Sequence, residues 1–214
     1  MIVLAIHTAG PACDLALLKD DAIIAEVREE MTRGQDARLP GLVENLLEKA
    51  GIALVDIDRF AVITGPGSFT GIRVGVAFAR GLALATNRPC LGVTLLEATL
   101  PTGQQGSALV ALPAQKRPPD ITFWTQTFRT GVATNLATEM RLEDMIDFLT
   151  DRPHMLYGDA KSLSTHLPQQ VHEATPSAAL AARIAAHGDP SERPARPTYV
   201  RAPDAALPQT KLKI

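Results

Sequence analysis

One segment, VITGPGSFTGIRVGVAFARGLA at residues 62–83, constrains the fold more than any other part of the chain. An apolar run leads into a loop with three glycines and a proline, and a second apolar run follows. Glycine permits positive φ and close backbone approach, while proline fixes its own φ. A strand, a glycine loop and a helix start in this order are typical of α/β proteins, in which the helix N-terminus can also bind an anion.

The loop consists of Gly65, Pro66, Gly67, Ser68, Thr70 and Gly71. A P-loop requires a lysine before Ser or Thr at the helix start, but Ile72 and Arg73 follow the last glycine here. The dinucleotide pattern G-x-G-x-x-G is not matched either, because the glycines are spaced two and then four residues apart. Ser68 or Thr70 is suited to cap the helix. The spacing therefore favours a loop that serves backbone geometry, with a phosphate site as the alternative.

The helix predicted after the loop, from about Thr70 to Ala85, is apolar or small around most of its circumference, and its charges are Arg73 and Arg80. A surface helix needs only one apolar stripe. Either this helix is buried on all sides in its own fold, or one side packs on its sheet and the other on a partner protein. We expect the larger side chains of the helix, Val74, Phe78 and Leu82, to face the sheet. Small residues let another helix approach closely, so we expect a partner interface formed by Ile72, Gly75, Val76, Ala79, Arg80 and Ala83.

The remaining pattern of the first half predicts three strands, a helix and a strand before the loop, and another strand after its helix. This order, βββαβαβ, indicates a mixed sheet flanked by helices. The second half is less regular, with a hairpin, a short helix, a strand and an alanine-rich helix at 177–188. We place the division between residues 1–103, which carry the glycine loop and the partner-binding helix, and residues 104–214, which end in an extended proline-rich tail.

Composition and charge argue against several classes of protein. The 214 residues are 46% hydrophobic and 21% charged, which is ordinary for a soluble globular protein. The net charge of −2 lacks the basic excess of a protein that binds nucleic acid by itself. No apolar run reaches the ~18 residues that span a bilayer, and the N-terminus lacks the basic region of a secretory signal. We therefore expect a cytoplasmic protein without a membrane segment.

The sequence shows no catalytic, cofactor-binding or metal-binding residues that we can name. Cys13 and Cys90 are not spaced as a redox or zinc pair. Ser68 does not lie in the G-x-S-x-G pattern of a nucleophile elbow. Four histidines, which form no H-x-x-x-H pair, are scattered over the second half: His154, His166, His172 and His187.

Three segments resemble the bacterial TsaB family, formerly called YeaZ. The most specific is GPGSFTGIRVGVAFARGLA, at residues 65–83. The opening VLAIHTAGPACDLALL resembles the family's N-terminal strand pair, and YVR at residues 199–201 resembles a feature near its C-terminus. The resemblance is strong over residues 1–100 and thin beyond them.

The resemblance implies the fold of the actin, hsp70 and sugar-kinase superfamily: an α/β arrangement of two ribonuclease H-like halves with mixed sheets, the second half reduced. It implies a role in forming N6-threonylcarbamoyladenosine at position 37 of tRNA. In that role the chain is not the catalyst. It pairs with its paralogue TsaD, which carries the metal and transfers the threonylcarbamoyl group, and the ATPase TsaE joins the pair. The chain then meets tRNA only through the complex. A homodimer that uses the same helix is the alternative when TsaD is not present.

The chain also departs from the family pattern. The superfamily usually has Asp, which serves the nucleotide's metal ion, where this chain has His7, and imidazole is a poor magnesium ligand. The family often has His near Gln35, and it commonly has Asp-Ala-Arg where this chain reads LPAQKRPPD from Leu112. These departures favour a scaffold without a cofactor over an enzyme. The alternative function is a small-molecule kinase or ATPase of the same superfamily, which would require Asp at position 7 and a longer chain.

Overall fold

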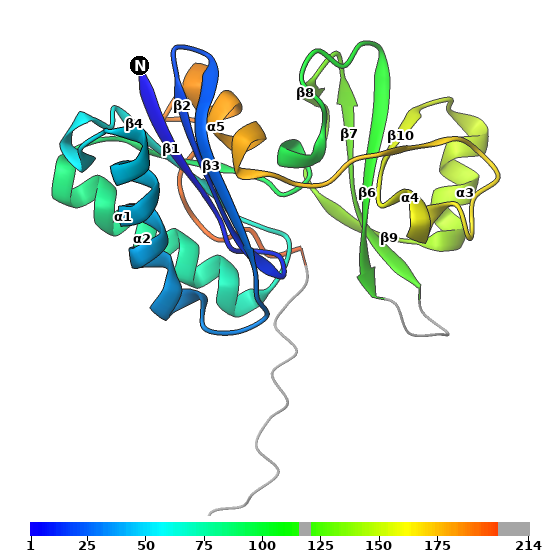
Figure 1. The fold of residues 1–214 in the computed structure, drawn as a ribbon. Coiled ribbons are helices and arrows are strands. Elements are labelled where there is room, and N and C mark those ends of the chain that lie inside the picture. Colours follow the sequence, from blue (N-terminus) through cyan, green and yellow to red (C-terminus); the bar gives the residue numbers. More distant parts are fainter. Residues whose placement is uncertain (116–120, 201–214) are drawn as a thin grey trace, which may run out of the picture.

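Two mixed sheets organise the computed structural model, which describes residues 1–115 and 121–200. The first sheet has the strand order β3-β2-β1-β4-β5 (Figure 1). Strands β1, β2 and β3 form an antiparallel meander, and β4 and β5 continue the sheet in parallel on the other side of β1. The predicted order βββαβαβ is confirmed. The bounds are β1 Ile2–His7, β2 Ala12–Lys19, β3 Ala22–Glu30, β4 Arg59–Ile63 and β5 Cys90–Val93.

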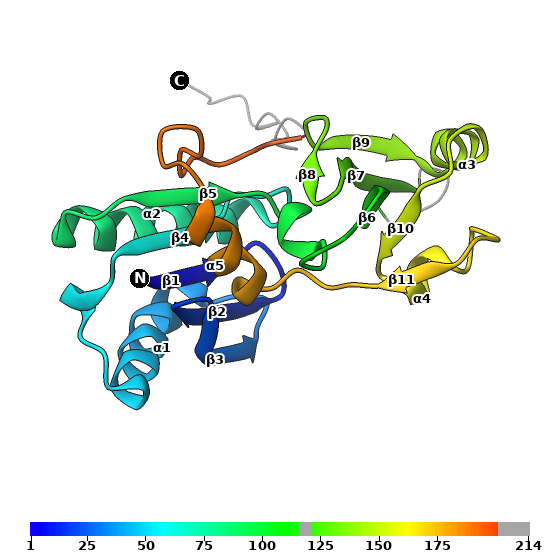
Figure 2. The ribbon, with the colours of Figure 1, turned by 90° about the horizontal axis from the view of Figure 1, so that it is seen from above.

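Helices cover both faces of this sheet. Strand β1 reads IVLAIH and is buried at all but its first residue, as a strand covered on both faces requires. Helices α1 and α2 contact each other and pack on one face, while α5 contacts β1, β2 and β4 from the other (Figures 1 and 2). The bounds are α1 Gln35–Ala50, α2 Phe69–Thr86 and α5 Ala178–His187, with single 3₁₀ turns at Leu54–Asp56 (η1) and Glu97–Thr99 (η2).

The second sheet has the order β11-β10-β6-β7-β8, and β9 also pairs with β7. The predicted hairpin of β6 and β7 is confirmed, although most of its turn, at residues 116–120, lies outside the described residues. The short strands β8, β9 and β11 were not predicted. The bounds are β6 Ser107–Gln115, β7 Thr122–Arg129, β8 Val132–Ala133, β9 Thr138–Arg141, α3 Leu142–Asp151, β10 Met155–Gly158, α4 Ala160–Leu163 and β11 Val171–Glu173.

The two faces of strand β6 belong to different cores. Leu109 and Ala111 join a small cluster with Met145 and Leu149 of α3. Ala108 and the other alternate apolar residues of β6 join the large cluster that also contains the first sheet. Because side chains alternate across a strand, the second sheet is covered by its own helices on one face and contributes the other face to the main core.

The chain returns to the first sheet after the second one is complete (Figure 2). Helix α5 packs there, and the following segment bonds to β4 and β5: Gly92 N–H donates to the Arg193 carbonyl at 2.9 Å, and Thr198 N–H to the Thr64 carbonyl at 2.8 Å. The division between residues 103 and 104 remains a proposal, but residues from α5 to Thr198 are held by the first half. Residues 201–214 of the predicted proline-rich tail lie outside the described part.

Candidate functional site

The glycine loop fastens the start of α2 to the end of β1 by backbone contacts. Ser68 is the cap, because its Oγ accepts from Gly71 N–H at 3.2 Å, and its own N–H donates to the Ala9 carbonyl at 2.8 Å. Thr8 Oγ1 donates to the Gly71 carbonyl at 2.7 Å. A side-chain carbon at Gly67 would collide with the Ala9 carbonyl, and one at Gly71 with the Thr8 carbonyl. These glycines therefore permit a close backbone approach that no other residue allows.

The other loop residues complete this turn. Gly65 has a positive φ of 116°, and its carbonyl accepts from Leu95 N–H at 2.7 Å. The peptide bond between Gly65 and Pro66 is cis. Thr70, the second candidate cap, is exposed within the first turn of α2.

The small-residue stripe of α2 faces the sheet of its own chain. Its buried members are Ile72, Gly75, Val76, Ala79 and Ala83. Gly75 lies so close to Thr8 that a Cβ at this position would collide with the threonine hydroxyl. The expectation that these five residues face outward is therefore wrong, because the close approach they permit is used by the sheet of the same chain, at β4, β1 and Thr8, instead of by a partner helix. Arg80, the sixth residue of the predicted interface, is exposed.

The opposite side of α2 is apolar and open to solvent. Leu84 is 84% exposed, Phe78 is half-buried, and Ala77, Gly81 and Ala85 are exposed between them. By length and composition alone α2 is apolar enough to cross a membrane, with a mean hydropathy of 1.2 over 18 residues, but it packs on β4 and β1. Its excess apolarity therefore forms a surface, which we call the α2 outer face: Ala77, Phe78, Gly81, Leu84 and Ala85.

A cleft of about 560 Å³ opens beyond the end of β1. The first half lines it with the end of β1, the start of α1 and the glycine loop, and the second half with strands β6 and β7 and the loops after β10 and β11. The lining residues from the first half that carry polar side chains are His7, Arg28, Thr32, Gln35 and Ser68. Those from the second half are Trp124, Asp159, Glu173 and Thr175.

His7 is the deepest polar group of the cleft, with 2% of its surface exposed. Burial, assisted by the nearby Arg28 guanidinium, lowers the pKa of His7 to about 3, so the ring is neutral near pH 7. Its Nδ1 accepts from Ala9 N–H at 3.3 Å, which leaves the ring proton on Nε2. Nε2 has no hydrogen-bond partner among the described residues.

Arg28 also lines the cleft, and its guanidinium is already paired with two carboxylates. Arg28 Nε donates to Glu30 at 2.8 Å, and an Arg28 terminal nitrogen lies 3.5 Å from Asp14 Oδ2. Burial raises the pKa of the Asp14 carboxyl, although Ala178 N–H donates to it at 3.0 Å. Within the described ranges, no group of three or more His, Cys, Asp or Glu side chains is placed to bind a metal ion.

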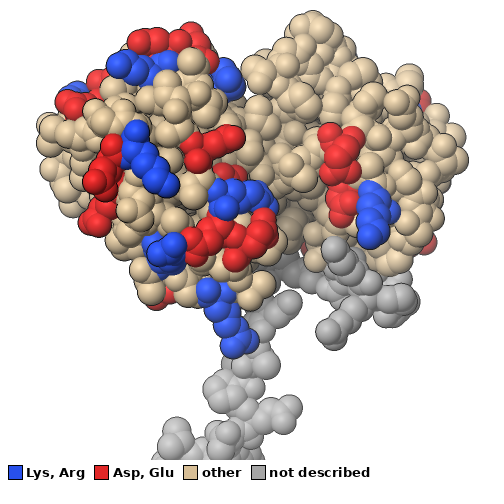
Figure 3. All heavy atoms as spheres, viewed as in Figure 1, with Lys and Arg blue, Asp and Glu red and all other residues tan. Residues whose placement is uncertain are grey.

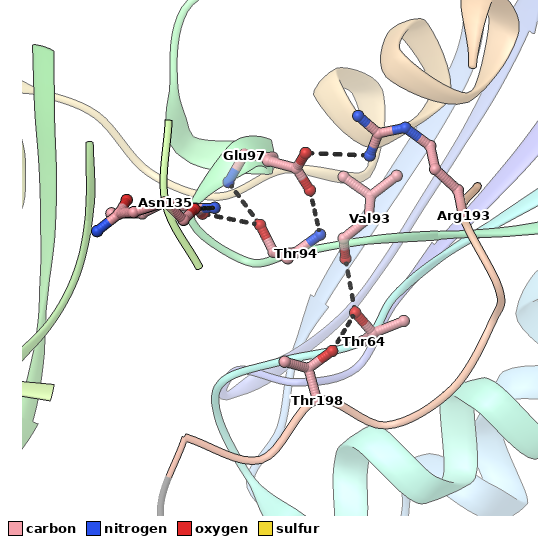
Figure 4. A network of polar contacts seen from close by, with 8 residues as sticks. Thr64, Val93, Thr94, Glu97, Asn135, Arg193 and Thr198 are labelled. Atoms are coloured by element: carbon pink, nitrogen blue, oxygen red, sulfur yellow. Dashed lines mark hydrogen bonds and ion pairs between the residues drawn. The ribbon is translucent and has the colours of Figure 1, made fainter. Parts of the chain in front are cut away.

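A polar network joins the C-terminal segment to the connection between the two sheets (Figure 4). Glu97 accepts from Thr94 N–H at 2.8 Å and from an Arg193 terminal nitrogen at 3.0 Å. Thr94 Oγ1 donates to Gln126 of β7 at 3.2 Å. The Glu97 side chain is 14% exposed, so this ion pair is shielded from solvent and ties residues from both halves together.

Charges on the face shown in Figure 3 are mixed in sign. Lys and Arg alternate with Asp and Glu over the first half, whereas the second half shows few charges there. This face therefore offers no broad basic surface of the kind that binds a nucleic-acid backbone.

Sequence reasoning identified some cleft residues and missed others. His7, Gln35, Gly67 and Ser68 were singled out from motifs or from the family resemblance. Trp124, Asp159 and Glu173 carried no signal, because each stands alone in an ordinary strand or turn and reaches the cleft only through the packing of the two halves.

The chain is similar to several known proteins. The family model described as TsaD, tRNA N6-adenosine threonylcarbamoyltransferase, matches residues 24–115. A tRNA threonylcarbamoyladenosine biosynthesis protein TsaB from Bacillus subtilis is 28% identical over 80% of this chain and 76% of its own length. The protein of the same name from Escherichia coli is 41% identical over 50% of this chain and 44% of its own length. A solved structure, YeaZ from Pseudomonas aeruginosa, is 26% identical with a TM-score of 0.67 and covers 92% of this chain and 99% of its own.

The two mixed sheets, with helices on both faces of the first, define a protein of the actin, hsp70 and sugar-kinase-like fold class. Within that class, the likeness to TsaB proteins over the sequence and to YeaZ over nearly the whole structure is specific. These likenesses support the assignment of the chain to the TsaB/YeaZ family.

Proposed function

We propose that this chain acts in tRNA threonylcarbamoyladenosine biosynthesis as a non-catalytic subunit that pairs with TsaD. The likeness to TsaB proteins supports the role in this biosynthesis. The α2 outer face supports the pairing of this chain with TsaD, because Leu84 is 84% exposed at the centre of an apolar surface there. Exposed apolar surfaces of this kind mark protein-protein contacts.

The α2 outer face replaces the small-residue stripe as the proposed partner surface. Ala77, Gly81 and Ala85 are small and surround Leu84, so a partner helix can come close while the leucine inserts between its side chains. Arg80 lies on the same side and supplies a charged rim. Burial of Leu84 contributes about 2 kcal/mol to association, because a fully buried leucine side chain is stabilised by about 1.5–3 kcal/mol.

The test compares Leu84→Arg with Leu136→Arg. Leu136 is 85% exposed and lies on the second half, so it is a matched control for an exposed leucine. Both variants should fold. We expect Leu84→Arg to raise the Kd for the host's TsaD at least roughly thirtyfold, equivalent to about 2 kcal/mol, and to abolish tRNA modification by the reconstituted mixture, while Leu136→Arg changes neither. Equal binding by both variants would place the contact elsewhere.

The wider assembly follows the same proposal. TsaE joins the pair, and tRNA is met only through the complex. Without TsaD, two copies of this chain associate through the α2 outer face, so Leu84→Arg should sediment as a monomer where the unaltered chain forms dimers. A monomer in both cases would remove the homodimer and leave the pairing with TsaD untouched.

A small-molecule kinase or ATPase is the second candidate, and the cleft between the halves is the observation that favours it. It predicts phosphate release from ATP by the purified chain with magnesium. A turnover above ~1 per minute would reject the non-catalytic proposal, since such a rate is slow for an enzyme yet needs a formed site.

A further inference from the structure

We propose that the cleft beyond β1 binds a small uncharged molecule with a flat apolar body and a hydrogen-bond acceptor that receives the proton of His7 Nε2. The cleft lies apart from the α2 outer face, and this inference does not depend on the pairing with TsaD. It concerns a ligand that accepts a hydrogen bond from the His7 side chain.

His7 supplies the donor for such an acceptor. The ring is almost fully buried, its Nδ1 is satisfied by Ala9 N–H, and its Nε2–H has no partner among the described residues. Nε2 is not among the side-chain atoms closed off from solvent without a partner, so its proton faces the open space of the cleft, where an acceptor on a ligand can take the place of water. The space beside it is kept open by Gly10, where a Cβ would lie 3.5 Å from Nε2.

The charges of the lining favour an uncharged ligand. Arg28 is the one Lys or Arg among the described lining residues, and both Asp14 and Glu30 already hold it. Two further carboxylates, Asp159 and Glu173, also line the cleft and accept backbone N–H groups near the start of α4. Arg28 with its two carboxylates and Glu173 together present more negative than positive charge to a carboxylate or polyphosphate ligand, whereas neutral imidazole suits a neutral carbonyl or ring nitrogen.

The walls fit a flat apolar body. Leu95, Leu112 and Pro113 line the cleft together with Trp124, whose indole offers a planar surface. The volume of about 560 Å³ lies within the roughly 300–1,000 Å³ usual for small-molecule sites. Such sites are mostly apolar, with a few polar groups that fix the ligand's orientation.

Benzamide and benzoate test the inference because they share a ring and differ in charge. Trp124 is the only tryptophan of the chain, so its fluorescence reports on the cleft directly. N-acetyltryptophanamide, titrated in parallel, corrects for collisional quenching. We expect a saturable change with benzamide and a Kd on the order of 1 mM, as befits a ligand of this size, and binding of benzoate at least tenfold weaker.

Matched glycine variants assign the site to His7. Gly10→Ala places a methyl group over Nε2 at ordinary contact distance, and Gly81→Ala places one in open space on α2. Gly10→Ala should weaken benzamide binding at least tenfold with an unchanged melting temperature, while Gly81→Ala should not weaken it. His7→Leu, which removes the donor, should match Gly10→Ala. Ligand-observed NMR repeats the measurement without relying on Trp124.

Three results would overturn the inference. The first is an unsaturated benzamide titration up to about 10 mM in both assays. The second is equal binding of benzamide by folded Gly10→Ala and the unaltered chain, which would show that Nε2 is not the contact. The third is magnesium-ATP binding tighter than benzamide, which would make the cleft a nucleotide site.

Discussion

Protonation of His7 should make the fold sensitive to mild acid. Burial holds the pKa of His7 near 3 in the folded chain, while the unfolded value is about 6.5. Below pH 6.5 the unfolded state therefore binds more protons than the folded state, and stability falls as the pH falls. From about pH 7.5 to 5.5 the loss from this one group is about 1.4 kcal/mol, and each further unit costs about 1.4 kcal/mol until the pH approaches the folded pKa.

The assay is urea unfolding of the unaltered chain and of His7→Gln at about pH 7.5, 6.5 and 5.5. Glutamine keeps a polar side chain of similar size but does not titrate, and all other ionisable groups are shared by the two proteins. The difference in unfolding free energy between them should therefore shift by about 1.4 kcal/mol in favour of the variant over this range. A difference that stays constant with pH would refute the conclusion that His7 is held neutral by burial.

Four substitutions test how α2 packs on its sheet. Gly75→Ala should lower the unfolding free energy by about 1–3 kcal/mol because its methyl group meets the Thr8 hydroxyl, whereas Gly81→Ala, in open space, should raise it by about 0.5–1 kcal/mol; urea titrations measure both. Gly67→Ala should cost about 1 kcal/mol or more, and added ATP should not restore the melting temperature if the loop serves geometry alone. Ala79→Arg should unfold the chain by circular dichroism, since Ala79 is 0% exposed; a folded Ala79→Arg would show that the stripe faces outward after all.

The first half could be predicted because its local patterns and its packing agree. Alternation and continuous apolar runs marked β1, β2 and β4, and a 3.6-residue period marked α1, whose buried residues include Leu39, Leu42, Val43, Leu46 and Leu47. Each of these elements is long, periodic and buried, so its sequence is constrained at most positions.

The second half could be predicted only in part. Strands β8, β9 and β11 have two to four residues and lie at the edge of the sheet or beside its path, where few positions are buried. Too few residues are then constrained for a period to emerge. The packing of α5 on the first sheet is a long-range contact. An alanine-rich helix can pack on either half, so its local sequence does not indicate which half it contacts.

The cleft was the least predictable feature, because its residues share no local pattern. His7 ends a strand, Gln35 begins a helix, and Trp124 and Glu173 lie in the other sheet. Each is ordinary in its own segment. What makes the group a site is the volume that remains between two packed halves, which depends on the whole topology.

The orientation of α2 shows why an apolar helix can be recognised and still be assigned the wrong face. Its sequence contains two apolar sides, one small and one bulky, and bulk alone suggested that Phe78 faces the sheet. The start of α2 is fixed by hydrogen bonds to the Thr8 hydroxyl and the Ala9 carbonyl, which draw the helix so close to Thr8 that position 75 has room only for glycine. Once that contact is made, the small stripe lies on the sheet, Val74, Phe78 and Leu82 are only partly buried against the core, and Leu84 is left exposed. The glycine loop therefore determines which face of α2 is left exposed to solvent.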